Sequence, residues 1–288
     1  MRDFVKQNKY HDGLLFFQIG SEFPDLIMNP SNYGLLFFTG KGKVNGVYTK
    51  DVFEEEVLPV LVDLPDFLKK LSISKEVKTL FSNFISKEVE AYAKDYVAEY
   101  LDYYRQFKVK ASSLGELQYV LTQMQLPTSQ FQDFLLTIKE NTALNLEDSP
   151  YLQTFSLKLR TFGFIQRLME ERKGVFPELE KYKIILGQMQ EDLKKETPFV
   201  AKNEMDEANE LKSRLSPLGR ISLAIFRNED DSYLNLVEMW LKNVGISTAW
   251  QDLFLTPVYE AYLLGLTEVQ AMVNKVWDEL WVSNVQPI

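Results

Sequence analysis

The sequence has no cysteine and one histidine, and these two shortages exclude several kinds of site. Without cysteine the chain has neither disulfides nor thiolate metal ligands. A tetrahedral zinc site needs several nitrogen or sulfur ligands, so His11 does not indicate one. The G-x-S-x-G, H-E-x-x-H and G-x-G-x-x-G signatures of hydrolases, zinc proteases and dinucleotide-binding proteins are also missing. We therefore expect no metal, no cofactor and no enzymatic activity.

Long hydrophobic runs and positive charge are scarce as well. No stretch reaches the ~18 consecutive apolar residues of a membrane span, and the first ten residues lack the apolar core of a signal peptide. We expect a soluble, untargeted chain, either independent or a segment of a longer protein. Its 32 basic and 41 acidic residues give a net charge of −9, which disfavours nucleic acid and anionic lipid as partners.

Aromatic residues, by contrast, recur at helical spacing between residues 86 and 107. A helix advances about 100° per residue, so side chains three and four apart share one face. The apolar face predicted in this way consists of Val89, Tyr92, Tyr96, Tyr100, Tyr103 and Phe107. A neighbouring face carries Glu88, Asp95, Glu99, Asp102 and Gln106, and we interpret it as charged and solvated. This segment is predicted to be the docking helix around which the fold is organised.

Residues 1–50 have a different character. Short apolar runs at 14–19 and 35–38 are separated by Pro24 and Asn29-Pro30, and a glycine-rich stretch at 39–46 follows the second run. These are turn-forming residues, so the sequence predicts a small strand-containing lead-in with a hairpin turn at 39–46. The glycine-rich stretch lacks the spacing of a phosphate-binding loop.

From Lys50 onward the pattern is helical and predicts a mainly α fold, a multi-helix array or bundle. We expect Asp51 to cap the first helix, Pro59 and Pro65 to divide it, and the second copy of the tetrapeptide SKEV, at Ser86, to mark a break. Domains are predicted at 1–50, 51–145 and 146–288. Further helices are expected at Leu114–Gln125, Gln130–Thr142, Tyr151–Arg172, Phe176–Lys195, Asn203–Leu215, from Pro217 with Ser216 as N-cap, Tyr233–Lys242, Trp250–Leu264 and Thr267–Trp281.

Four tryptophans are concentrated in the final third of the chain: Trp240, Trp250, Trp277 and Trp281. Such a cluster can line a ligand pocket. Large aromatic side chains in a helical array more often belong to the core, and we favour that interpretation.

The order of the motifs resembles the periplasmic region of the IcmF/TssM family, the inner-membrane core proteins of type VI secretion systems. Gly46-Val47-Tyr48-Thr49 precedes a short acidic helix, and Tyr92, Asp95, Tyr96 and Tyr100 follow the family's "Y..dY...w" pattern, with tyrosine in place of tryptophan. Residues 121–144 resemble its helix pair but have Gln130-Phe131 where Ser-Pro is expected. The stretches 216–224, 240–266 and 276–288 are similar to its end, whereas 145–215 match only in helical character.

This resemblance implies a non-enzymatic structural segment of the secretion system's envelope-spanning membrane complex, located in the periplasm as part of an inner-membrane protein. The implied partners are a DotU/TssL-type membrane protein, a TssJ-type outer-membrane lipoprotein and further copies of the chain, with no nucleic acid and no small-molecule substrate. The family's cytoplasmic nucleotide-binding loop has no counterpart here. The chain ends about where the family continues into the β-rich part credited with lipoprotein contact, so that binding surface is expected to be missing.

The residues predicted to form an interaction surface are the acidic and aromatic side chains of the docking helix and two of the tryptophans: Glu88, Tyr92, Asp95, Tyr96, Glu99, Tyr100, Asp102, Trp240 and Trp250. Two other functions remain open at the level of sequence. One is an independent cytosolic helical adaptor that binds a partner peptide in an aromatic groove. The other is a carboxylate-dependent hydrolase of cell-wall glycan, since paired carboxylates beside aromatic rings occur in glycosidases.

Overall fold

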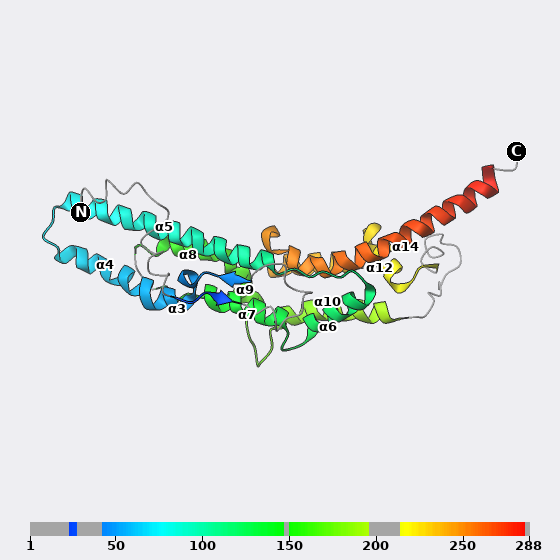
Figure 1. The fold of residues 1–288 in the computed structure, drawn as a ribbon, viewed down its shortest axis with the longest axis horizontal. Coiled ribbons are helices and arrows are strands. Elements are labelled where there is room, and N and C mark those ends of the chain that lie inside the picture. The colour runs from blue at the N-terminus through cyan, green and yellow to red at the C-terminus, as the bar shows by residue number, and fades with distance from the viewer. Residues whose placement is uncertain (1–22, 28–41, 147–149, 196–213, 286–288) are drawn as a thin grey trace. The chain divides into compact units, whose positions relative to one another are not determined.

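The computed structural model describes residues 23–27, 42–146, 150–195 and 214–285 (Figure 1). His11, the apolar runs at 14–19 and 35–38, and most of the helix predicted at Asn203–Leu215 lie outside these residues. The described part of the chain is mainly α-helical with one small antiparallel strand pair, which confirms the predicted fold class. Among the described residues, no helix has the length and apolar character needed to cross a membrane.

The chain divides into two compact units. The first comprises residues 1–107 and 134–169, and the second comprises 108–133 and 170–288. The boundary predicted at residue 145 falls inside the second segment of the first unit. Each unit therefore consists of two separate stretches of sequence, an arrangement that local patterns do not encode.

The first unit begins with strands β1 (Leu26–Ile27) and β2 (Lys43–Val44), in which Leu26 pairs with Val44. Residues 43 and 44 were expected in a hairpin turn, but they form a strand. After the 3₁₀ turn η2 (Gly46–Tyr48), the chain forms α3 (Lys50–Val52), a π-helical turn η3 (Phe53–Val57) and α4 (Leu58–Lys70).

The helical run from Lys50 to Lys70 corrects two predictions. Its N-cap residue is Thr49, so Asp51 lies inside the first turn, where its charge still suits the helix dipole. Pro59 and Pro65 do not divide the run. Pro59 stands in the first turn of α4, directly after the π-helical turn, where a missing backbone N–H costs little.

Helix α5 (Lys75–Gln106) carries the predicted docking face and is uninterrupted. Ser74 caps it by accepting a hydrogen bond from the Val77 backbone N–H at 3.4 Å. Ser86 was predicted to cap a second helix, but it lies in mid-helix and its hydroxyl donates to the Ser82 carbonyl at 3.0 Å. The predicted break is therefore absent, because the same tetrapeptide can cap a helix or continue one.

Helices α7, α8 and α9 complete the first unit. The span of α7 (Gln130–Thr142) agrees with the prediction, and its residues from Phe134 onward belong to this unit. The single helix predicted at Tyr151–Arg172 is instead α8 (Gln153–Leu159), a 3₁₀ turn (Arg160–Phe162) and α9 (Gly163–Leu168). Helix α8 packs along α5, and Phe155 of α8 is fully buried there.

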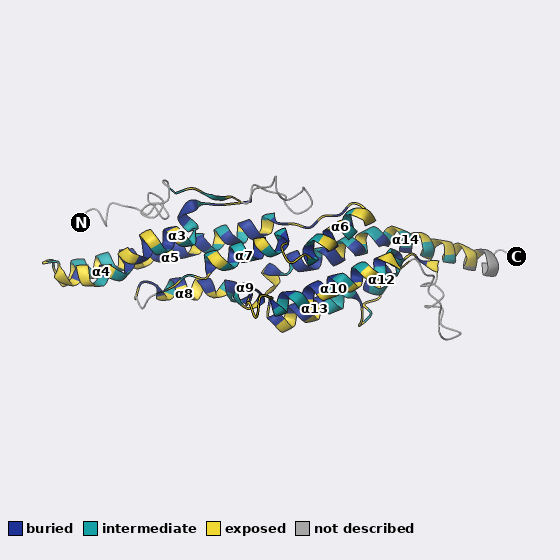
Figure 2. Ribbon diagram, turned by 90° about the horizontal axis from the view of Figure 1, so that it is seen from below, coloured by how far each residue is buried: buried dark blue, intermediate teal, exposed yellow. Residues whose placement is uncertain are grey.

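The second unit contains α6 (Leu114–Gln125), α10 (Pro177–Lys194), α12 (Pro217–Phe226), α13 (Tyr233–Val244) and α14 (Asp252–Val285). The span of α6 and the Ser216 cap of α12 agree with the prediction; the Ser216 hydroxyl accepts from the Gly219 N–H at 3.1 Å. The two helices predicted at Trp250–Leu264 and Thr267–Trp281 are one continuous α14. Figure 2 shows that α14 is largely buried at its start and exposed towards its end.

Helices α12 and α14 cross at very short range. A Cβ atom added to Gly265 would lie 2.6 Å from the carbonyl oxygen of Leu218, so only glycine allows this approach. Glu268 of α14 accepts a hydrogen bond from the Ser216 backbone N–H at 2.6 Å, and Ser222 donates to the Tyr262 carbonyl at 2.8 Å. These contacts fix which side of α14 faces the rest of the second unit.

Candidate functional site

The predicted docking tyrosines of α5 are buried, with exposed fractions of 2 % for Tyr92 and 0 % for Tyr96 and Tyr100. The Tyr92 hydroxyl donates to the Val47 carbonyl at 2.8 Å, and the Tyr100 hydroxyl donates to the Tyr48 carbonyl at 3.0 Å. The Tyr96 hydroxyl donates to the carbonyl of Asn141 in α7. Each ring is buried while its polar atom is satisfied, so these tyrosines join the segment around η2 and the end of α7 to α5.

The acidic face of α5 is solvated only in part, which corrects the sequence interpretation. Glu88 is 5 % exposed, and Asp95 and Glu99 are half-buried. Glu99 accepts a hydrogen bond from the Asn45 backbone N–H at 2.8 Å, and Gln106 accepts one from Gly42 at 3.0 Å. Of the four carboxylates, Asp102 alone is exposed, and it pairs with Arg105 at 3.7 Å.

Tyr48 lies between these two sets of side chains. Its ring packs 5.5 Å from that of Tyr92 and 6.1 Å from that of Tyr96. Burial, together with the negative charges of Asp95 and Glu99, raises the pKa of Tyr48 from 10.0 to about 12. The hydroxyl of Tyr48 therefore stays neutral at physiological pH. We call Tyr48 and the buried tyrosines Tyr92, Tyr96 and Tyr100 the aromatic junction.

Gly46 is fixed in the same junction. Its N–H donates to Asp25 at 3.2 Å, and a Cβ atom at this position would lie 2.5 Å from the carbonyl oxygen of Phe23. The backbone of residues 23–24 thus passes directly over Gly46. The stretch Gly46-Val47-Tyr48 is held by α5 on one side and by the chain before β1 on the other.

The two predicted interface tryptophans also belong to the core. Trp240 is 5 % exposed; its ring stacks on that of Tyr182 at 4.8 Å, and its Nε1 donates to the Glu178 carbonyl at 3.0 Å. Trp250 is fully buried. Trp277 and Trp281 differ, with exposed fractions of 64 % and 52 %. The core interpretation is therefore right for the first pair and wrong for the second.

Six of the nine residues predicted to form an interaction surface are thus buried in this structure: Glu88, Tyr92, Tyr96, Tyr100, Trp240 and Trp250. The physical reason is common to them. Helical periodicity identifies which side chains share a face, but it does not say whether that face meets the same chain or another one. Asp102 remains as an exposed member of the set.

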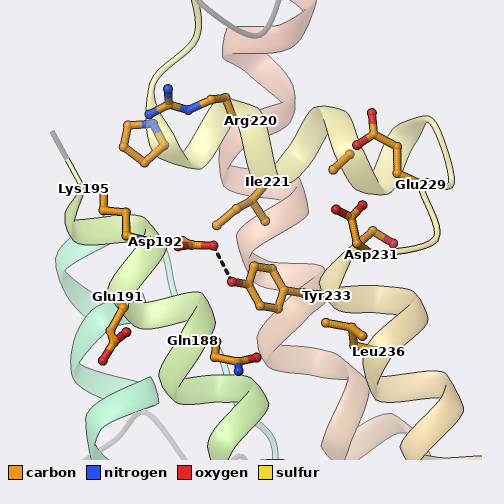
Figure 3. Close-up of a pocket in the computed structure, with 13 residues that line it drawn as sticks. Gln188, Glu191, Asp192, Lys195, Arg220, Ile221, Glu229, Asp231, Tyr233 and Leu236 are labelled. Atoms are coloured by element: carbon orange, nitrogen blue, oxygen red, sulfur yellow. Dashed lines mark hydrogen bonds and ion pairs between the residues drawn. The ribbon is translucent and has the colours of Figure 1, made fainter. Parts of the chain in front are cut away.

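A cavity of about 580 Å³ lies in the second unit and was not anticipated from the sequence. It is lined by the end of α10, by α12, and by the loop and first turn of α13 (Figure 3). At its centre the Tyr233 hydroxyl donates to Asp192 at 2.6 Å, and the Lys195 ammonium donates to the other carboxylate oxygen at 2.7 Å. Asp192 and Tyr233 are 41 residues apart and belong to no motif, so no sequence signal brings them together.

The chemistry of this cavity is set by Asp192. Burial by itself would raise the pKa of this carboxyl, but hydrogen bonds from Lys195 and Tyr233, with the nearby charges of Lys195 and Arg220, outweigh that effect and hold the pKa below its ordinary value. Burial and the same hydrogen bond raise the pKa of Tyr233. Asp192 is thus kept ionised and Tyr233 protonated, which suits a polar contact between α10 and α13 better than general acid catalysis.

The rim of the cavity carries charges of both signs. Figure 3 shows Lys195, Asp192 and Glu191 together on the α10 side and Glu229 and Asp231 on the opposite side, with Arg220 and the apolar side chain of Ile221 on α12. No group of histidine, cysteine or acidic side chains among the described residues is arranged to hold a metal ion. Charges of both signs around an apolar side chain suit the binding of a small amphipathic group.

Comparisons with known proteins give no match to this chain, whether with family models, with curated proteins or with solved structures. The fold and the site define a mainly α protein of two units, with an aromatic junction in the first and a charged cavity in the second.

Proposed function

We propose that this chain is a non-enzymatic structural segment of the envelope-spanning membrane complex of a type VI secretion system, a member of the IcmF/TssM family that acts in scaffold assembly in the periplasm. Its partners would be a DotU/TssL-type membrane protein, a TssJ-type outer-membrane lipoprotein and further copies of the chain. The proposal begins from the order of motifs along the sequence, which resembles that family.

One structural observation supports the proposal most directly. Two of the motifs that carry the resemblance, Gly46-Val47-Tyr48-Thr49 and the tyrosine pattern of α5, are more than forty residues apart and bind each other. Tyr92 and Tyr100 donate to the carbonyls of Val47 and Tyr48, and Glu99 accepts from the preceding Asn45. The two motifs therefore act as one packed unit in this chain, which a shared structural role would require.

The residues of these two motifs form a rigid, tightly packed part of the first unit. Their polar atoms are used in hydrogen bonds within the first unit, and their rings form a continuous buried cluster with Phe53 and Phe155. Buried aromatic pairs add stability beyond their area, and satisfied buried hydroxyls specify one packing. A scaffold subunit that transmits position rather than performs chemistry needs these properties.

The proposal is tested by locating the native protein in cells that make it. An antibody raised against this 33.5 kDa chain would be used on fractionated cells, with protease added to spheroplasts. We expect a band much larger than 33.5 kDa in the inner-membrane fraction that external protease cuts. A cytoplasmic protein of known location, probed on the same blot, must stay protected. A soluble, protected band of the chain's own size would contradict the proposal.

The predicted interaction surface is tested separately, by a substitution at its exposed residue Asp102. Asp102→Lys changes the charge of an exposed residue and should leave the fold intact, whereas Glu99→Lys would also remove the acceptor of the Asn45 hydrogen bond. Secretion and complex assembly should decrease in the Asp102→Lys variant if this face contacts a partner. Unchanged assembly would remove the face from the interface.

The charged cavity favours one alternative, a cytosolic helical adaptor that binds a partner peptide. Its charges of both signs around the apolar side chain of Ile221 are features that a peptide groove uses for orientation. The cell fractionation described above separates the two functions, because the adaptor would be found as a soluble band protected from external protease.

A further inference from the structure

Helix α14 carries a stripe of exposed apolar side chains on one side. Tyr259, Leu263, Val273, Trp277 and Trp281 are between 42 % and 64 % exposed. At 100° per residue, all five point within about 40° of one direction. Half-buried Leu266 and exposed Gln270 lie on the same side of the helix, between Leu263 and Val273. The stripe extends over roughly 33 Å of helix at ~1.5 Å per residue. We call this set the α14 stripe.

The α14 stripe does not belong to the packing of the second unit. The side of α14 that meets α12 contains Ala261, which is fully buried, Gly265, which allows the close crossing, and Glu268, which binds Ser216. The stripe lies on another side of the helix. The rings of Trp277 and Trp281 stack on each other, with their centres 6.5 Å apart. A contiguous row of large apolar side chains on a helix surface is typical of an interaction site.

The spacing of the α14 stripe is nearly symmetric about Gln270. Tyr259 and Trp281 stand eleven residues before and after it, and Leu263 and Trp277 stand seven residues before and after it. When two copies of α14 lie antiparallel with Gln270 at the two-fold axis, Tyr259 meets the partner's Trp281 and Leu263 meets the partner's Trp277. A two-fold interface requires this kind of self-complementarity, since the same surface serves on both sides.

The area is also sufficient for such a pair. A large side chain presents ~150–250 Å², and exposure of about half of it in five residues gives roughly 500 Å² of apolar surface per copy. The two copies together would bury about 1,000 Å², which is the lower limit for a specific interface. Gln270 would lie in the centre, where paired amides can hydrogen-bond and set the register, as a single polar residue does in coiled coils.

We propose that the α14 stripe is a self-association surface, on which a second copy of this chain docks antiparallel about Gln270. This inference deepens the scaffold function by naming the partner at the tryptophan-rich end. It is tested on the purified chain, so its failure would be visible whether or not the cellular location is as proposed above.

Charges beside the α14 stripe should make the affinity of the dimer depend on salt concentration. Glu260 and the partner's Asp278 would lie on the same side of the antiparallel pair, offset by about 3 Å along the helix axis. These like charges weaken association at low ionic strength, and added salt screens them. The dimer should therefore become tighter as salt is raised. Glu260→Lys should tighten it further, by about 3- to 10-fold in Kd, because each of the two equivalent contacts becomes an ion pair.

The first experiment is sedimentation equilibrium of the full chain over a range of concentrations. We expect a monomer–dimer equilibrium, weakened at least ~10-fold by Trp277→Asp. Ile184→Asp is the matched control, because Ile184 of α10 is similarly exposed, at 59 %, but lies outside the stripe. A chain that stays monomeric at every concentration, or a dimer that Trp277→Asp leaves unchanged, would overturn the proposal.

The second experiment fixes the register and exploits the absence of cysteine. Gln270→Cys should form an intermolecular disulfide under mild oxidation, because the two sulfurs meet at the axis. Leu263→Cys should not, since its own counterpart would lie about 21 Å away along the helix. Glu260→Lys combined with Asp278→Lys should lose the gain in affinity of the single change. Cross-linking through Leu263→Cys, without cross-linking through Gln270→Cys, would refute the antiparallel register.

Discussion

Removal of one hydroxyl from the aromatic junction should destabilise the first unit. Tyr92 is 2 % exposed, and its hydroxyl donates to the carbonyl of Val47 at 2.8 Å. Tyr92→Phe keeps the ring and its packing against Phe53, so it changes the hydrogen bond alone. The carbonyl of Val47 is left in a buried position without this donor, which costs about 1–2 kcal/mol. The melting temperature should fall by roughly 2–8 °C.

Two measurements check this expectation. Thermal unfolding followed by circular dichroism gives the loss of stability, and amide hydrogen exchange locates it. The amides of Tyr48 and Thr49 bond to the carbonyls of Asn45 and Gly46, at 2.9 and 3.1 Å, and both should exchange faster in the variant. Tyr119→Phe is the control, because Tyr119 is 49 % exposed, and its stability should match the wild type within ~0.5 kcal/mol.

The reasoning would be refuted by a Tyr92→Phe variant with wild-type stability and unchanged exchange at residues 48 and 49. Such a result would mean that the segment around η2 is held by the rings and by Glu99, with no net contribution from the tyrosine hydroxyl. A loss of stability without faster local exchange would also contradict it, because the effect would then arise elsewhere in the first unit.

Three further changes test other parts of the structure. Gly46→Ala should lower the free energy of unfolding in urea by about 1–3 kcal/mol, because its Cβ would meet backbone atoms; Gly115→Ala, with open space around its Cβ, should not destabilise the chain. The free energy of unfolding should fall as the pH rises from 10.0 to about 12, because the unfolded chain releases the Tyr48 proton at a lower pH than the folded chain does. Tyrosinate absorbance during an alkaline titration measures this release. The lowered pKa of Asp192 stabilises the fold above pH 3.8, and this contribution is lost as the pH falls below that value. The Asp192→Asn variant should therefore lose less stability in acid than the wild type. Urea denaturation at several pH values measures the difference.

The repeated tetrapeptide SKEV shows where local sequence reasoning ends. At Ser74 the preceding residues leave the helix, so the serine caps α5, whereas at Ser86 the chain is already helical and the serine hydroxyl bonds back to Ser82. Nothing within the four residues distinguishes the two cases. Burial of the following face, with Val89 and Tyr92 packed inside the first unit, favours continuation of the helix over a second cap.

Helix bounds were predicted best where capping and turn residues agree with the periodicity of the apolar side chains. The spans of α6 and α7 follow from the serine caps and polar turns around them, and Ser216 with Pro217 marks the start of α12. The prolines at 59 and 65 misled the prediction because a π-helical turn precedes the first, and because the buried side chains of Leu61, Leu64 and Leu68 hold the helix together around the second. Packing outweighs a lost hydrogen bond there.

The sequence by itself determined the mainly α fold class, the apolar face of α5 and the absence of cysteine chemistry, because composition and periodicity are properties of single segments. The tertiary structure alone decided which faces are covered. It buried Tyr92, Tyr96 and Trp240, left Trp277 and Trp281 exposed, and brought Asp192 to Tyr233 in the cavity. The physical reason is that burial and long-range hydrogen bonds depend on how distant segments meet, and that information is not contained in any one helix.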